Sequence, residues 1–284
     1  MNTINADLAV LHSTCIAAAL SQSLWQKSPV DMQERGMKRR SFLASALATS
    51  TLGRKAYAKS RILVLGTDVE LKPFDFPQGG RYVGFDQDVF SEIARDLSVS
   101  YTVTPMDFGA LMPALQTASI DAAISSIAIT PERARAVDFS DPYYISTLGV
   151  LVRADNASIF TSSDLRKKSV AAITGTAGAR WLKEHMPEAD VTLFPQTSSM
   201  YLELQINRVD AIVHDKPNLA YYARTKGKGA VRLLMQPIGD PIPCGIAFPK
   251  GSPLRAPTNA ALKAIRADGR YDKLNMAWFG QVPV

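Results

Sequence analysis

The side chains best suited to binding chemistry stand where apolar strands end or short helices begin. His214 and Asp215 close the apolar run Ala211–Val213, and Arg133 follows Thr130, which is typical of a helix N-cap. An arginine fork matches a carboxylate, and a carboxylate matches a cation. These residue types therefore suit contacts with charged groups. Two alternatives remain open, because Arg133 also suits a surface helix and Asp215 also suits an N-cap.

A loop of small residues offers a second kind of site. Thr174-Gly175-Thr176-Ala177 follows one expected strand and precedes a helix. Backbone N–H groups and the helix dipole favour an anion at such a place. Many strand–helix turns have this composition, so the loop does not identify a ligand by itself.

The sequence after residue 58 contains no residue pattern typical of a metal or cofactor site. His185, His214 and Cys244 are the only histidines and cysteine after residue 58, and they lack metal-ligand spacing. His185 ends a helix, where its cation is mildly favoured, so we interpret it as structural. We expect no cofactor, no metal ion and, with one cysteine after residue 58, no internal disulfide there.

Strands and helices alternate after Lys59. Short apolar runs predict strands, and apolar residues at helical spacing predict helices. The expected strands are 61–66, 101–105, 120–124, 148–152, 169–173, 211–213 and 245–248. The expected helices lie near 85–97, 111–115, from 130 onward, 179–184, 199–207, 218–223 and 260–267, the last one stopping at Asp268-Gly269. Repeated β-α-β units predict a mostly parallel sheet with helices on both faces.

The pattern occurs twice, so we expect an α/β fold of two lobes. Turn-forming residues at 141–144 and 239–243 predict two crossings between the lobes. The expected division is lobe 1 at 59–142 plus 245–284, lobe 2 at 148–239, and hinge crossovers near 143–147 and 240–244. A cleft between two hinged domains is a common place for a ligand.

Residues 1–58 have the features of an export segment. From Met37 a basic run leads into a short, weakly apolar stretch and then Ala56-Tyr57-Ala58, as in a secretory signal. The Arg39-Arg40 pair resembles a twin-arginine signal. We expect cleavage after Ala58 and a periplasmic protein. A basic tail before a small apolar helix is the alternative, and the long lead 1–36 leaves Met37 open as the start.

The charge distribution argues against nucleic acid as a partner. The 284 residues carry a formal net charge of +6, but residues 59–284 hold 25 basic and 23 acidic residues. A nearly neutral body has no electrostatic reason to bind a polyanion. With 46% hydrophobic and 20% charged residues, the composition is that of a globular protein.

Five segments, in order, resemble one known family. They are 82–86 (YVGFD), 106–108 (MDF), 129–141 (ITPERARAVDFSD), 213–218 (VHDKPN) and 245–252 (GIAFPKGS). They resemble bacterial solute-binding protein family 3, the polar amino-acid-binding proteins of ABC importers, and most of all the glutamine-binding proteins. The resemblance spans about residues 61–279. It implies the two-lobed type II periplasmic-binding-protein fold, a small amino-acid ligand, a membrane permease as partner, a monomer and no enzyme.

The resemblance also implies the ligand-binding residues. Arg133 would hold the α-carboxylate, and Asp215, on the opposite lobe, would hold the α-ammonium. Ser125 and Ser126 match positions whose carbonyls meet the ligand. The implied set is Asp68, Phe108, Ser125, Ser126, Arg133, Ile173, Ala177, His214 and Asp215.

Four positions depart from the glutamine-binding pattern. Leu71 replaces an aromatic residue, Ile173 a lysine, Ala128 a threonine and Ala177 a glycine. Without the lysine, the far end of the pocket keeps only the charge of Asp68, so we expect a neutral polar side chain first, a basic one second and a modified amino acid third. Two other functions stay open: a binding protein that feeds a sensor, and an exported dehydratase of the prephenate or arogenate type.

Overall fold

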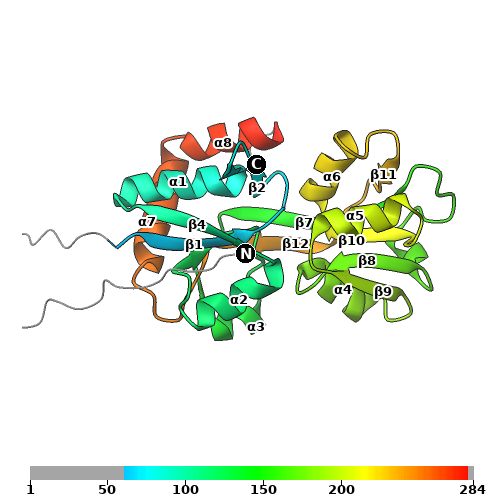
Figure 1. The fold of residues 1–284 in the computed structure, drawn as a ribbon, viewed down its shortest axis with the longest axis horizontal. Helices are drawn as coiled ribbons and strands as arrows, with labels where there is room; N and C mark the ends of the chain where they lie inside the picture. Colours follow the sequence, from blue (N-terminus) through cyan, green and yellow to red (C-terminus); the bar gives the residue numbers. More distant parts are fainter. Residues whose placement is uncertain (1–60, 281–284) are drawn as a thin grey trace, which may run out of the picture. The chain divides into compact units, whose positions relative to one another are not determined.

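The structure, a computed structural model, describes residues 61–280. The expected export segment lies outside these residues. The described residues belong to one compact unit and form two α/β lobes (Figure 1). None of its helices combines the length and apolarity that crossing a membrane requires.

Lobe 1 is built on a five-stranded sheet with the order β4-β1-β5-β13-β6. The parallel strands are β1 (Leu63–Asp68), β4 (Tyr101–Met106) and β5 (Ala122–Ala123). β13 (Ala247–Phe248) runs antiparallel to β5 and β6 (Asp138–Phe139), and a small hairpin joins β2 (Phe76–Gln78) to β3 (Arg81–Val83). The helices are α1 (Phe85–Leu97), α2 (Phe108–Gln116), α3 (Pro131–Ala136), α7 (Arg255–Ala267) and α8 (Arg270–Phe279).

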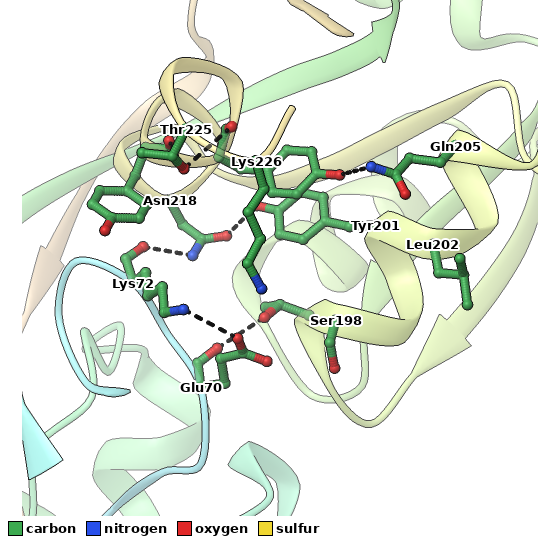
Figure 2. A pocket seen from close by; sticks show the side chains of 12 residues that line it. Glu70, Lys72, Ser198, Tyr201, Leu202, Gln205, Asn218, Thr225 and Lys226 are labelled. Carbon is green, nitrogen blue, oxygen red and sulfur yellow. Dashed lines mark hydrogen bonds and ion pairs between the residues drawn. The ribbon is translucent and has the colours of Figure 1, made fainter. Parts of the chain in front are cut away.

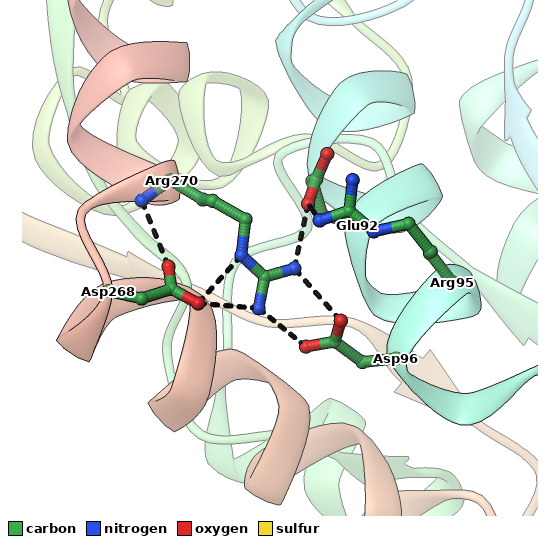
Figure 3. Close-up of polar contacts among 5 residues, drawn as sticks. All are labelled: Glu92, Arg95, Asp96, Asp268 and Arg270. Atoms are coloured by element: carbon green, nitrogen blue, oxygen red, sulfur yellow. Dashed lines mark hydrogen bonds and ion pairs between the residues drawn. The ribbon is translucent and has the colours of Figure 1, made fainter.

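Helix α8 is tied to α1 through Arg270 (Figure 3). Its guanidinium pairs with Glu92 at 2.8 Å, Asp96 at 2.7 Å and Asp268 at 2.7 Å. Helix α7 ends at Ala267 with Asp268 as its C-cap, where a helix end is expected, but it is not the last helix. Gly269 takes a left-handed conformation, φ +78°, and a further helix begins directly after it.

Lobe 2 is built on a six-stranded sheet with the order β11-β7-β10-β8-β9, and β12 also pairs with β7. The strands are β7 (Tyr144–Arg153), β8 (Ser169–Ile173), β9 (Asp190–Phe194), β10 (Ala211–Asp215), β11 (Val231–Leu233) and β12 (Ile238–Cys244). The helices are α4 (Ala177–His185), α5 (Thr197–Gln205), α6 (Lys216–Arg224) and a 3₁₀ turn, Ser162–Leu165. Because β7 is antiparallel to β10, β11 and β12, this sheet is mixed rather than mostly parallel, which corrects the prediction.

Two paired strands carry the chain between the lobes. β7 enters lobe 2 and β12 returns to lobe 1, and Figure 1 shows them side by side. Tyr144 pairs with Cys244, and Ser146 with Ile242, before the register shifts between Ile242 and Ile238. The segment 239–243, expected to turn, is therefore extended within β12, whereas residues 141–143 bend ahead of β7 as expected. Rotation of the lobes about them stays a prediction.

Candidate functional site

A small cavity lies where the two lobes meet. It is lined from lobe 1 by Asp68, Leu71, Phe108, Ser125, Ser126, Ala128 and Arg133, from lobe 2 by Thr176, Ala177, His214 and Asp215, and by Ile242 of the crossing strand β12. Eight of the nine residues expected at the site thus share one cavity. Its volume is about 20 Å³, which is room for roughly one water molecule. With the lobes placed as in this structure, the cavity is too small for an amino acid.

Arg133 reaches this cavity from α3. Thr130 caps the helix as expected, because its hydroxyl accepts the Arg133 N–H at 3.2 Å. Nη1 donates to the Ala128 carbonyl at 2.9 Å, and Nη2 donates across the lobes to the Gly175 carbonyl at 2.8 Å. The guanidinium also lies over the Phe108 ring, 5.2 Å from its centroid. Burial, followed by the nearby Arg180, lowers the pKa of Arg133 to about 10, which leaves it a cation at neutral pH.

Asp215 ends β10 on the opposite lobe. It occupies the N-cap position of α6, but its side chain makes no capping hydrogen bond. The N-cap alternative for Asp215 is therefore right in position, but the carboxylate does not act as the cap. The residue is buried, and burial raises its pKa to about 6, against the lowering effect of Ser126 and Arg133. A cationic group placed beside this buried carboxylate would stabilise its ionised form.

His214 is the least satisfied polar group of the cavity. Its side chain is 3% exposed, and neither ring nitrogen has a hydrogen-bond partner among the described residues. Burial lowers its pKa to about 4, so the ring is neutral at pH 7. A neutral imidazole presents one N–H donor and one nitrogen acceptor.

Asp68 stands at the carboxyl end of β1. Its Oδ1 accepts the Glu70 N–H at 3.0 Å, and its own N–H donates to Ser125 Oγ at 3.3 Å. Burial raises its pKa to about 6, with a smaller contribution from Asp107. Phe108 opens α2, so a carboxylate and an aromatic face border the same cavity.

Ser125 and Ser126 follow β5 and complete the lobe 1 wall. Ser126 has a left-handed backbone, φ +44°, and its N–H donates to Asp86 Oδ2 at 2.8 Å. Asp86 is fully buried in α1, and burial raises its pKa to about 7. Beside it, Asp75 is also fully buried, accepts from Gln87, and has its pKa raised by burial and by Asp86. Asp86 belongs to the family-like segment 82–86, but the sequence does not predict that it lies buried beside Asp75.

The loop before α4 forms the facing wall. Thr176 caps α4, accepting the Ala179 N–H at 3.4 Å. Gly178 lets α4 approach β10 closely, since a Cβ there would lie 2.8 Å from the Val213 carbonyl oxygen. The expected anion loop therefore lies beside His214 and Asp215, with the Gly175 carbonyl already bound to Arg133.

Comparison with known proteins decides the family. Residues 63–281 match the bacterial extracellular solute-binding proteins, family 3. The chain belongs to this family. The expected membership is thereby confirmed, and the family accounts for both lobes.

Three relatives of this family-3 protein illustrate the range of ligands. The L-arginine-binding protein of Pseudomonas aeruginosa is 31% identical, over 84% of this chain and 95% of the relative. The ABC transporter glutamine-binding protein GlnH of Bacillus subtilis is 32% identical, over 76% and 80%. The solved structure of an ancestral arginine-binding protein bound to glutamine has 36% identity and a TM-score of 0.74, covering 78% of this chain and 98% of that one. The predicted type II periplasmic-binding-protein fold is confirmed by these neighbours.

Ile173 corrects the predicted site of this family-3 chain. Its side chain is 1% exposed and packs in a lobe 2 core with Met200, Leu204 and Leu219, away from the cavity. Ile242 is the lining residue that sequence reasoning missed altogether. It lies on the crossing strand, and no local motif marks it. Among residues 61–280 no group of three or more histidine, cysteine or acidic side chains is placed to hold a metal ion.

Proposed function

We propose that the protein is the substrate-binding component of an ABC importer and that it binds a polar L-amino acid, with glutamine-like side chains preferred over basic ones. One observation carries the proposal: Arg133 and Asp215 border one cavity from different lobes. An amino acid has a carboxylate and an ammonium group on one carbon, and burying either without a partner is prohibitive. Two opposite charges on facing walls match this pair of groups.

Arg133 supplies the carboxylate half. Its two donors now satisfy the carbonyls of Ala128 and Gly175. A ligand carboxylate would replace at least the second of these bonds with a charge-assisted one, which is stronger. The α4 loop beside it adds backbone donors. Ala177 and Ser126 would contribute contacts from the two walls.

His214 and Asp68 favour an amide side chain. Neutral His214 has one donor and one acceptor to satisfy, and a carboxamide offers an acceptor oxygen and a donor nitrogen. A guanidinium has donors only and leaves the imidazole N–H unmet. Asp68, ionised at neutral pH, accepts from the same amide or from a cation. An acidic side chain would face Asp68 without an offsetting cation.

The exported location and the partner complete the proposal. The mature chain begins at Lys59 after cleavage of the twin-arginine-like segment, acts in the periplasm as a monomer, and delivers its ligand to a membrane permease. Mass spectrometry of the periplasmic form tests the cleavage, and an N-terminus before residue 50 contradicts it. The alternatives are tested by adding prephenate or arogenate and by identifying the membrane partner, since a sensor would replace the permease.

The experiment for the binding function is a thermal-shift screen with the twenty amino acids. A ligand that binds only the folded state raises its melting temperature. We expect glutamine or another neutral polar amino acid to give the largest shift. No shift with any of the twenty, for wild-type protein, would reject amino-acid binding.

A further inference from the structure

A second and larger cavity opens between the same two lobes. Its volume is about 390 Å³, within the range of small-molecule sites. Glu70 and Lys72 line it from lobe 1, and helices α5 and α6 with the turn after α6 line it from lobe 2 (Figure 2). None of its lining residues borders the amino-acid cavity. It is a separate place on the molecule.

A single short segment separates the two cavities. Leu71 borders the amino-acid cavity, whereas its neighbours Glu70 and Lys72 border the larger one. Two hydrogen bonds from lobe 2 hold this segment: Thr197 Oγ1 donates to the Glu70 carbonyl at 2.9 Å, and Asn218 Nδ2 donates to the Lys72 carbonyl at 2.6 Å. The larger cavity therefore exists in this form only while the lobes are closed, and it shares a wall with the amino-acid site.

Tyrosine side chains line the lobe 2 side of this cavity, and Tyr201 and Tyr222 are each 7% exposed. Tyr201 and Tyr222 stack in parallel, with ring centroids 3.6 Å apart and an interplanar angle of 2°. Tyr201 donates to Asn218 Oδ1 at 2.6 Å, and Gln205 Nε2 donates to the Tyr222 hydroxyl at 2.6 Å. Leu202, 51% exposed, extends the apolar surface. An apolar, ring-bearing ligand suits this wall.

The side chains that line the cavity carry more positive than negative charge. Lys72 is compensated by Glu70, with 3.5 Å between Nζ and Oε1. Lys226 also lines the cavity, and Figure 2 shows its side chain extending over it with no ion pair or hydrogen bond to the residues drawn. Among residues 61–280, Lys226 therefore has no ionic partner, and it lies beside the tyrosines of the cavity. A carboxylate on the ligand would meet it.

We propose that this cavity is a second binding site for a small aromatic carboxylic acid, and that its occupancy favours the closed lobes. The ring packs on the Tyr201–Tyr222 side, and the carboxylate pairs with Lys226. Because the acid touches both lobes, it binds the closed form better and raises the affinity of the amino-acid site. By linkage, the amino acid raises the affinity of the second site for the acid by the same factor. Binding of the aromatic acid to this second cavity does not depend on which amino acid the first cavity takes.

Isothermal titration with indole-3-acetate tests the site, with indole-3-acetamide as an uncharged analogue of similar shape. We expect saturable binding of the acetate and weaker binding of the amide. Lys226→Ala should weaken acetate binding by about fivefold, the upper range for a partly exposed ion pair, while Lys228→Ala, also exposed but not lining the cavity, leaves it unchanged. Leu202→Trp fills the cavity and should abolish binding. Indole-3-acetate should tighten amino-acid binding.

The contrary results are distinct. Absence of saturable binding at millimolar acetate, or equal binding by the Lys226→Ala and wild-type proteins, would overturn the site. Loss of acetate binding in Arg133→Ala with retention in Leu202→Trp would place the acid in the amino-acid cavity instead. An amino-acid affinity that acetate leaves unchanged would overturn the link to closure. Amino-acid binding without any acetate binding rejects this site and leaves the proposed function intact.

Discussion

Arg133 of lobe 1 donates through Nη2 to the carbonyl of Gly175 in lobe 2, at 2.8 Å. The guanidinium therefore joins the two lobes through a backbone carbonyl. Thr197 and Asn218 add two more hydrogen bonds from lobe 2 to lobe 1 carbonyls. A ligand carboxylate would take the place of the Gly175 carbonyl on Arg133.

Replacement of Arg133 should remove most amino-acid binding. Arg133→Ala leaves the ligand carboxylate without its charged partner, which should cost at least about 2–5 kcal/mol of binding free energy. That is a fall in affinity of roughly 30-fold or more by titration calorimetry. Arg135→Ala is the matched control, because Arg135 lies in the same helix and is exposed. Equal losses in the two variants would contradict the assignment.

Amino-acid affinity should fall in acid. Burial raises the pKa of Asp215 to about 6, above its ordinary 3.8, so below pH 6 the ligand-free carboxyl holds a proton that the ammonium must displace. Affinity should be level above pH 7 and decline below 6, by up to about tenfold per pH unit for each proton displaced. Asp68 titrates in the same range, so calorimetry on Asp68→Asn and Asp215→Asn separates the two. An affinity that does not change between pH 5 and 7 is the opposing outcome.

The free energy of unfolding should fall as pH rises, because of the buried Asp75–Asp86 pair. Burial raises both pKa values, that of Asp86 to about 7. The stability contributed by protonated Asp86 is therefore complete below about pH 4 and is lost as pH rises through 7. Asp86→Asn keeps a neutral side chain and should flatten the decline in the free energy of unfolding between pH 4 and 8. Asp240→Asn, at an exposed strand position, is the control. Urea unfolding measures the effect, and an unaltered pH slope in Asp86→Asn would speak against a buried proton.

The lobes should open in order to bind. A cavity of about 20 Å³ is too small for an amino acid, so the proposed binding requires the lobes to separate before ligand enters. The crossing strands near 143–147 and 240–244 are the proposed hinge. Small-angle scattering should show a smaller radius of gyration at saturating ligand than without it. Identical scattering curves would contradict hinged closure.

Much of the fold follows from local pattern. The strand Ser169–Ile173 and the cap of Thr130 on α3 lie where apolar runs and capping chemistry predict them. Helix α8 was missed, because Gly269 reads as a helix stop whether or not another helix follows. The antiparallel placement of β7 depends on pairing with distant strands, which no local window contains.

The site shows the same division. Arg133 and Asp215 were assigned through family resemblance, and the structure brings them to one cavity. Ile173 was carried over from a position where relatives have a lysine. Burial of an apolar side chain in the core beside Met200 is more favourable in free energy than exposure to a polar cleft. Ile173 therefore packs in the core and does not line the cavity. Ile242 enters only through the crossing strand.

Isothermal titration with glutamine, arginine, histidine and glutamate tests the central claim most directly. With neutral His214, ionised Asp68 and the Arg133–Asp215 pair, glutamine should bind most tightly and glutamate most weakly at pH 7.5. Arginine should fall between them, since Asp68 accepts its cation while His214 stays unsatisfied. Glutamate as the tightest ligand of the four, or no binding by any of them, would contradict the account.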